Sequence, residues 1–180
     1  MPIEMVLTII SRDRPGVVQK LAEIVTDHSG NWIDSSMARL GGEFAGILRV
    51  TMPEDCVAAF EDALMRLADQ DIAVTIRRDS AAPPPHGCRA RLTLTGADHR
   101  GIVRDVSSDL ARHGVSIDEL HTEVFPGSMT GEPMFTARAV VVLPEGLSTD
   151  ELREQLERIA NDIMVDLTLE ETDDSVTGSH

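Results

Sequence analysis

Hydrophobic positions along the chain alternate between short apolar runs and stripes at helical spacing. Residues 5–11 are apolar and rich in β-branched types, which predicts a buried strand. After a turn at residues 13–16, apolar side chains recur at helical spacing between Val17 and Val25, and Gly30 predicts a left-handed cap that ends this helix. The chain therefore begins with a strand and an amphipathic helix.

Two further runs and a second helix complete this first pattern. The runs at residues 32–40 and 44–52 are strand-like, and Gly41-Gly42 between them predicts a tight hairpin turn. A helix that opens at residue 53 and a strand at residues 72–76 follow. The predicted order is βαββαβ.

The same order of elements returns in the second half of the chain. Strands are predicted at residues 92–95, 117–125, 135–143 and 163–169, and helices at 102–110 and 149–160. With one small deletion and one hairpin insertion, the matched residues are Asp13 with Asp98, Gly16 with Gly101, His28 with His113, Gly30 with Gly114, Ile33-Asp34 with Ile117-Asp118, Phe44 with Phe135 and Pro53 with Pro144. These matches indicate an internal duplication.

A proline-rich segment separates the two halves. Residues 81–87 include three consecutive prolines, which favour an extended spacer over a packed element. We therefore predict a first domain at residues 1–79, a linker at 80–88, a second domain at 89–171 and a disordered tail at 172–180.

Charge and composition exclude several classes of protein. The 180 residues include 31 acidic and 16 basic side chains, and the resulting net charge of −15 disfavours direct contact with DNA or RNA. The N-terminus lacks the basic start and apolar core of a signal peptide, and no run is long enough to span a membrane. We expect a cytoplasmic protein with no nucleic-acid or membrane partner.

Cysteines and histidines form no metal-binding or catalytic pattern. Cys56, in a predicted helix, and Cys88, in the predicted linker, are interpreted as free thiols. His28 and His113 lie at equivalent helix ends, where the helix dipole favours an imidazolium. The sequence therefore predicts no catalytic residue, no metal and no cofactor.

The turn between the first strand and the first helix is the candidate binding site. Pro15 presets φ for the first helical position, and Gly16 lets a ligand approach the unpaired N–H groups of the helix. Arg14 adds a guanidinium, so the turn has the chemistry to bind a carboxylate. The structural alternative is that the turn only starts a helix, with Asp13 as its cap.

Two polar residues of the following strand are candidates for the other half of a ligand. Asn31 and Asp34 offer side-chain oxygens to an ammonium group, whereas the structural alternative is that Asn31 only tolerates a turn. In the second half, Arg100 replaces Pro15 and Ser116 replaces Asn31, which predicts a weaker site. The candidate residues are Asp13, Arg14, Pro15, Gly16, Val17, Asn31 and Asp34 in the first half and Asp98, Arg100, Gly101, Ile102, Ser116 and Asp118 in the second.

Two βαββαβ units, each with a glycine-bearing turn after its first strand, resemble tandem ACT domains. The two-copy arrangement is similar to the glycine cleavage system transcriptional repressors. The resemblance implies an α+β fold of two ferredoxin-like units, each an antiparallel sheet with helices on one face. It also implies a non-enzymatic homo-oligomer that binds a small amino acid or a related metabolite at domain interfaces. Such a protein would regulate gene expression or metabolism through a protein partner, such as a DNA-binding transcription regulator.

Other functions stay open. The Asp-Arg-Pro-Gly turn also resembles the ACT modules of formyltetrahydrofolate deformylases and of some phosphoserine phosphatases, but those enzymes need a further catalytic domain. The alternatives are a pure protein–protein interaction module and a regulatory subunit of an amino-acid or one-carbon metabolic enzyme. An enzyme of unrecognised chemistry ranks third.

A ferredoxin-like order has consequences for the surface. It places the second strand of each unit, at residues 32–40 and 117–125, at an edge of its sheet. Because bare edges invite aggregation, we expect a neighbouring unit or a second chain to cover them. The longer second hairpin, around residues 126–133, is a candidate loop for a partner.

Overall fold

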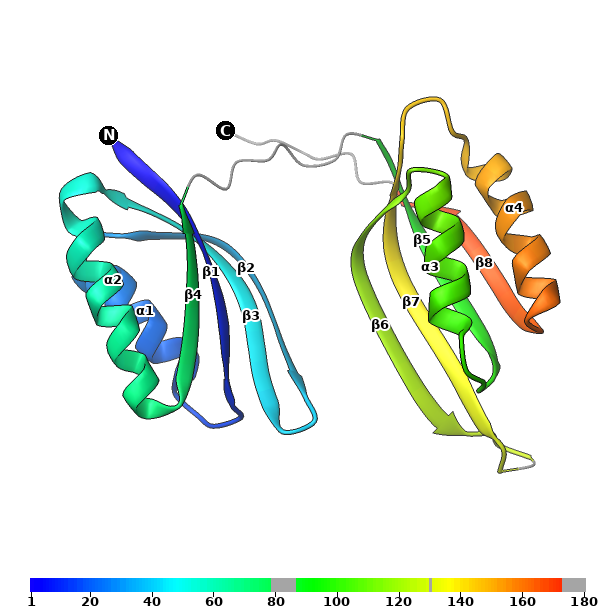
Figure 1. Cartoon of the computed structure of the whole chain (residues 1–180), viewed down its shortest axis with the longest axis horizontal. Helices are drawn as coiled ribbons and strands as arrows, with labels where there is room; N and C mark the ends of the chain where they lie inside the picture. The colour runs from blue at the N-terminus through cyan, green and yellow to red at the C-terminus, as the bar shows by residue number, and fades with distance from the viewer. Residues whose placement is uncertain (79–86, 130, 173–180) are drawn as a thin grey trace. The chain divides into compact units, whose positions relative to one another are not determined.

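A computed structural model of the chain describes residues 1–78, 87–129 and 131–172. The chain divides into two compact units, Met1–Ala82 and Pro83–His180 (Figure 1). Apart from residues 87, 88 and 172, the predicted linker and tail lie outside the described residues. Contrary to the linker prediction, Cys88 is the first residue of a strand, where it pairs with Leu143.

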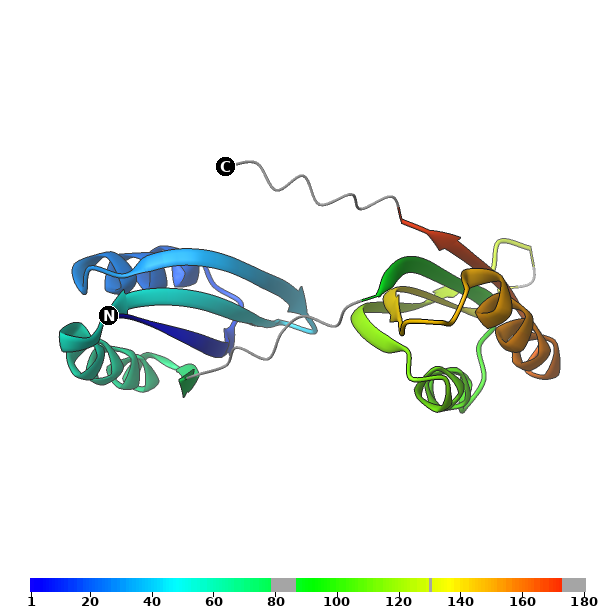
Figure 2. The same cartoon turned by 90° about the horizontal axis from the view of Figure 1, so that it is seen from above.

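The first unit has the predicted βαββαβ order. Its elements are β1 (Pro2–Arg12), α1 (Val17–Asp27), β2 (Asn31–Leu40), β3 (Glu43–Pro53), the 3₁₀ helix η1 (Glu54–Cys56), α2 (Val57–Met65), the 3₁₀ helix η2 (Arg66–Gln70) and β4 (Ile72–Arg78). The strands form one antiparallel sheet in the order β2-β3-β1-β4. Both helices lie on the same face of this sheet (Figures 1 and 2).

The core of the first unit follows from two periodicities. Alternate residues of β1, including Leu7 and Ile9, are fully buried, and Leu21 of α1 is buried against the same cluster. Phe60 of α2 is also fully buried. Period 2 in the strands and period 3.6 in the helices therefore bring the apolar sets together, and α1 is fixed against the sheet directly after the candidate turn.

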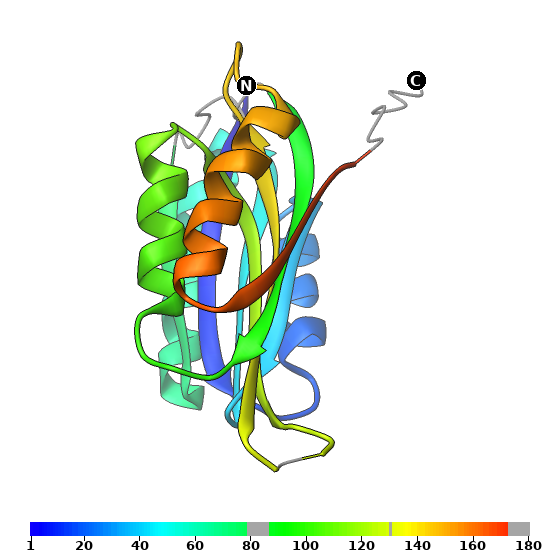
Figure 3. The same cartoon turned by 90° about the vertical axis from the view of Figure 1, so that its right-hand side faces the viewer.

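The second unit repeats this architecture. Its elements are β5 (Cys88–Ala97), α3 (Ile102–Arg112), β6 (Ser116–Pro126), β7 (Pro133–Leu143), α4 (Thr149–Asp162) and β8 (Val165–Glu171). The sheet order is β6-β7-β5-β8, and α3 and α4 cover one face (Figure 3). A capping box links Ser148 with Glu151 at the start of α4, and the hydrogen bonds from Ser148 lower the pKa of the Glu151 carboxyl.

The helix caps correct the predicted register of the repeat. The residues with left-handed backbone after the first helix of each unit are Ser29 (φ 58°) and Gly114 (φ 68°), so a left-handed Gly30 is wrong. Gly30 donates to the carbonyl of Val25 at 2.8 Å, and the corresponding bond in the second unit comes from Val115. Gly30 is better explained by close approach, since a Cβ there would lie 2.9 Å from that carbonyl oxygen.

The same correction applies to the strand that follows. Asn31 pairs with Thr51 and Ser116 with Val142, which confirms Ser116 as the counterpart of Asn31. After a bulge in each strand, however, Asp34 pairs with Arg49, and its counterpart in the second ladder is Glu119. The sequence match of Asp34 with Asp118 is therefore wrong, because the small deletion that this match assumed between the two units is absent here.

β2 and β6 lie at the edges of their sheets, as predicted. That a neighbouring unit or a second chain covers these edges stays a prediction.

Candidate functional site

The turn between β1 and α1 begins the helix differently from the prediction. Gly16 is the N-cap, with φ 94°, and α1 starts at Val17, whose side chain is buried. Pro15 therefore precedes the N-cap and does not occupy the first helical position. Among the described residues no side chain caps this helix, so its first N–H groups have no side-chain acceptor.

Asp13 ties the turn to the neighbouring hairpin. Its N–H donates to the carbonyl of Gly42 at 2.9 Å, and its carboxylate lies 2.7 Å from Nε of Arg39. The cap proposed as the structural alternative for Asp13 is therefore not formed. The residue fixes the base of the turn against β2 and β3.

A cleft of about 380 Å³ opens beside the turn, between α1 and the segment that leads into β4. Arg14 donates to the backbone carbonyl of Gln70, and Nζ of Lys20 donates to the side-chain oxygen of the same residue. Glu23 also lines the cleft and accepts a hydrogen bond from Gln19. Two cationic side chains thus converge on one exposed polar residue beside the N-terminus of α1.

Three residues of this cleft were missed from the sequence. Lys20 is the only lysine of the chain, and its place one turn after Gly16 was a signal that could have been used. Glu23 lies on the same stretch of the helix. Gln70 could not be found in this way, because its contacts with α1 cross fifty residues of sequence.

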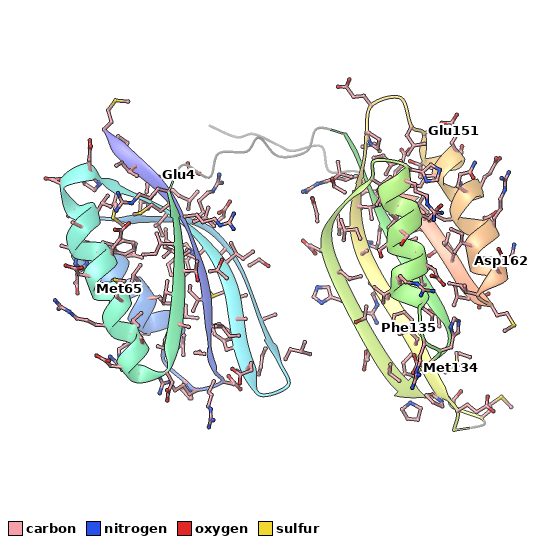
Figure 4. The ribbon with its side chains drawn as sticks, viewed as in Figure 1. Glu4, Met65, Met134, Phe135, Glu151 and Asp162 are labelled. Carbon is pink, nitrogen blue, oxygen red and sulfur yellow. The ribbon has the colours of Figure 1, made fainter. Side chains whose placement is uncertain are left out.

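Asn31 and Asp34 lie away from the turn within their unit. Asn31 pairs with Thr51, which also pairs with Glu4 of β1, so Asn31 lies level with Glu4 in the sheet. The turn follows Arg12, and the eight residues of β1 from Glu4 to Arg12 span roughly 26 Å. Figure 4 marks Glu4 at the end of β1 opposite to the turn. The structure therefore does not bring the two predicted halves of the site together in one unit.

Each of these residues has surroundings of its own. Asn31 lines an open hollow of about 780 Å³ together with Thr51 and Glu54. Asp34 forms a bidentate ion pair with Arg49, with Nη2 and Oδ2 2.6 Å apart, and Glu4 lies 3.3 Å from the same guanidinium. The hydrogen bond and the charge of Asp34 raise the pKa of Arg49 above its ordinary value, and Glu4 adds to this.

The second turn has the same backbone but different side chains. Gly101 is the N-cap of α3 with φ 99°, Ile102 is buried, and the N–H of Asp98 donates to Pro133. His99 occupies the place of Arg14, and its Nε2 lies 2.9 Å from the carbonyl of Ile163. The tie between the turn and the last loop is therefore present in both units.

The space beside the second turn is filled by side chains of α3. A Cβ added at Gly101 would lie 3.3 Å from Nη2 of Arg104, whereas one added at Gly16 would meet no heavy atom of the described chain within 4 Å. Asp105, which corresponds to Lys20, pairs with Arg104 at 2.8 Å. The first turn is thus open and cationic, and the second is covered and carries an acid.

The remaining candidates of the second unit lie apart from its turn. Arg100 is exposed in the turn itself. Ser116 starts β6 at the far end of the sheet, and Asp118 is the bulged residue of that strand, where it pairs with Arg89. Within the described residues, the turn of the second unit and the strand residue Ser116 thus lie at opposite ends of the sheet, as the turn and Asn31 do in the first unit.

The described part of the chain offers neither a metal site nor a membrane-spanning helix. Within residues 1–78, 87–129 and 131–172, no three His, Cys, Asp or Glu lie where they could hold one metal ion. No helix in these ranges is long and apolar enough to cross a membrane. His28 and His113 each lie 2.8 Å through Nδ1 from the carbonyl four residues earlier, which confirms their structural role at helix ends.

Comparisons with known proteins agree with this fold. A family model described as "ACT domain" matches residues 4–77. The glycine cleavage system transcriptional repressor of Escherichia coli (strain K12) is 27% identical over 124 residues, which cover 68% of this chain and 65% of the repressor. The match thus spans less than two thirds of the repressor's length.

Two solved structures resemble nearly the whole chain. An unknown protein from Galdieria sulphuraria is 31% identical, with a TM-score of 0.81, over 96% of this chain and 99% of that one. A structure assigned to a glycine cleavage system transcriptional repressor is 19% identical, with a TM-score of 0.72, over 96% and 98%, and supports the fold alone. The first unit therefore matches the ACT domain family, and the chain consists of two ferredoxin-like units.

Proposed function

We propose that this chain is a non-enzymatic regulatory protein that binds a small amino acid through the β1–α1 turn. In this proposal it acts on gene expression or metabolism through a protein partner. The curated repressor relative motivates the regulatory role, and the use of both units for the same fold supports a role without catalysis.

The cleft beside the first turn carries the proposal. Lys20 holds the side-chain oxygen of Gln70, which is a position where one oxygen of an α-carboxylate would be bound. Arg14 donates to the backbone carbonyl of Gln70, and the other N–H groups of its guanidinium are the donors that we assign to the second carboxylate oxygen. Because Gln70 is exposed, a ligand can displace its side chain. The dipole of α1 and its free N–H groups at Gly16 and Val17 add to the binding of an anion.

The ammonium group of the ligand needs an acceptor within a few ångströms of that carboxylate. Glu23 lines the same cleft and offers a carboxylate as this acceptor, although one of its oxygens accepts from Gln19. Asn31 and Asp34 lie about 20 Å or more from the turn of their own unit. Asn31 and Asp34 therefore stay candidates only if another unit or a second chain contributes them to the site. Within the first unit, we assign the binding of the ammonium group to Glu23.

A thermal-shift screen of the twenty amino acids, with glycine among them, tests the proposal. A ligand that binds only the folded state, at a free concentration of one hundred times its Kd, adds about 2.7 kcal/mol to the free energy of unfolding. For a unit of this size that corresponds to a rise of roughly 10–20 °C in Tm. No response to any amino acid at millimolar concentration would favour a protein–protein interaction module without a ligand.

A further inference from the structure

Gln70 contacts the cleft of the first unit in two ways. It is the last residue of η2, and its side-chain oxygen accepts a hydrogen bond from Nζ of Lys20. Its backbone carbonyl accepts a separate hydrogen bond from Arg14. The second unit shows which of these two contacts belongs to the fold.

The second unit has the backbone contact without the side-chain contact. Ile163 corresponds to Gln70, because in each unit the next residue has left-handed backbone, with φ of 54° and 56°, and the last strand then begins. The carbonyl of Ile163 lies 2.9 Å from Nε2 of His99, which occupies the place of Arg14. The side chain of Ile163 is apolar and packs against the core of its unit. The backbone contact is therefore a common feature of the fold.

The side-chain contact occurs beside the open turn of the first unit. This unit has the exposed Gln70 where the second unit has a partly buried isoleucine, and it has Lys20 where the second unit has Asp105. Together these two differences place a neutral oxygen on the ammonium group of the cleft. The fold itself does not need this oxygen, since the second unit has the same sheet order without it.

We propose that the side chain of Gln70 is an intramolecular competitor of the ligand, which lowers the affinity of the cleft by occupying the ammonium group of Lys20. This inference rests on the proposed function, because it concerns the same cleft. When a ligand binds, the side chain turns away from Lys20, while the backbone carbonyl of Gln70 stays bound to Arg14. The cleft thus opens without loss of the contact that both units share.

The exchange at Lys20 favours a carboxylate but reduces what the ligand gains. A carboxylate oxygen is charged and forms a stronger hydrogen bond with an ammonium group than a neutral amide oxygen does. The measured affinity, however, is the intrinsic affinity multiplied by the fraction of molecules in which Lys20 is unoccupied. If Gln70 occupied Lys20 in about 90% of molecules, it would weaken binding about tenfold. Gln70 therefore sets the ligand concentration at which the cleft fills.

Calorimetry of Gln70→Ile, which copies the second unit, tests the competition with the best amino acid from the thermal-shift screen. We expect this variant to bind roughly threefold to tenfold more tightly than the unmodified chain, because isoleucine cannot hold Lys20. Gln70→Glu is expected to bind severalfold more weakly, because its carboxylate pairs with Lys20 and repels the carboxylate of the ligand. Circular dichroism checks that both variants are folded.

A double-mutant cycle assigns the effect to Lys20. In a Lys20→Met background, the change of Gln70 to isoleucine should alter the affinity by less than about twofold, because no ammonium group remains for Gln70 to occupy. Equal tightening with and without Lys20 would show that Gln70 acts elsewhere and would overturn the proposal.

Chemical labelling measures the contact without any ligand. Lys20 is the only lysine of the chain, so acetic anhydride modifies one side-chain amine, and the N-terminal amine serves as an internal reference. Relative to that reference, acetylation of Lys20 should be about twofold or more faster in Gln70→Ile than in the unmodified chain. The matched control is Gln19→Ala, which removes another glutamine of the cleft, one that donates to Glu23. This control should leave the labelling of Lys20 unchanged.

The outcomes separate this inference from the proposed function. Equal labelling of Lys20 in the unmodified chain and in Gln70→Ile overturns the competition alone, and so does binding by Gln70→Ile that is equal to or weaker than that of the unmodified chain. If neither chain binds any of the twenty amino acids, the proposed function fails, and the competition fails with it.

Discussion

Replacing the glycine of each turn with leucine separates backbone strain from ligand binding. Gly16 and Gly101 have nearly the same backbone, with φ of 94° and 99°, which L side chains rarely adopt. Each substitution is therefore expected to cost on the order of 1–3 kcal/mol of folding free energy. Because the strain is matched, the two variants serve as controls for each other.

The effect on ligand affinity is expected to differ between the two. At Gly16 an added side chain enters space where no described heavy atom lies within 4 Å of its Cβ, which is the approach to the cleft. At Gly101 that space is already covered by Arg104. Gly16→Leu should therefore weaken amino-acid binding at least tenfold, about 1.4 kcal/mol, while Gly101→Leu should leave it within a factor of two.

Urea unfolding followed by circular dichroism measures the first effect, and calorimetry with an amino acid from the thermal-shift screen measures the second. Both variants must be folded at the temperature of the titration. Equal losses of affinity in the two variants, or a larger loss at Gly101, would refute the ranking of the turns.

Three further predictions concern the second unit and the chain's partners. Asp109 is 7% exposed, and its Oδ2 has no hydrogen-bond partner among the described residues. Among the same residues, its carboxylate has only long ion-pair contacts, at 3.9 Å from Arg112 and 3.7 Å from His113. Asp109→Ile, which copies Ile24 of the first unit, should therefore raise the free energy of unfolding in urea by about 1–3 kcal/mol. The carbonyl of Ile163, and then that of Arg100, raises the pKa of His99 above its ordinary 6.5, with Asp98 and Asp105 adding to this. Protonated His99 therefore adds to the free energy of unfolding, and this contribution is complete below pH 6.5 and is lost as the pH rises through the folded-state pKa. The urea midpoint of the second unit should fall over that pH range, and it should fall less in His99→Gln. In a mobility-shift titration at low salt, the purified chain should show no sequence-selective DNA binding, because its net charge is −15.

The order of elements could be predicted from the sequence because it depends on local patterns. Apolar residues such as Leu7 and Leu21 have the periods of a strand and a helix, and Gly41-Gly42 has the chemistry of a hairpin turn. These signals are contained in windows of a few residues. The repeat itself was also visible, since both copies keep their glycine-bearing turns.

The errors arose where one residue type fits two physical roles. Gly30 resembles a left-handed cap, yet the cap is Ser29 and the glycine serves a close backbone approach. That mistake shifted the register by one residue and paired Asp34 with the wrong aspartate. The strand bulges that follow leave no clear mark in the sequence.

The candidate site was only partly accessible from the sequence. The turn at Gly16 was identified from local chemistry, but the residues opposite it depend on how the chain returns to the turn. Gln70 reaches the turn through the packing of η2 and β4, and Asn31 is carried to the far end of the sheet by the direction of β2. Such placements depend on topology.

The central claim is that the carboxylate of an amino acid binds to Arg14 and Lys20 in the cleft of the first unit. The most direct test is calorimetry of the best amino acid from the screen and of its primary amide, with the unmodified chain and with Lys20→Met. We expect the amide to bind at least tenfold more weakly than the amino acid, and Lys20→Met to reduce that difference together with the affinity. Equal affinity for the amino acid and its amide, or unchanged binding by Lys20→Met, would contradict the claim.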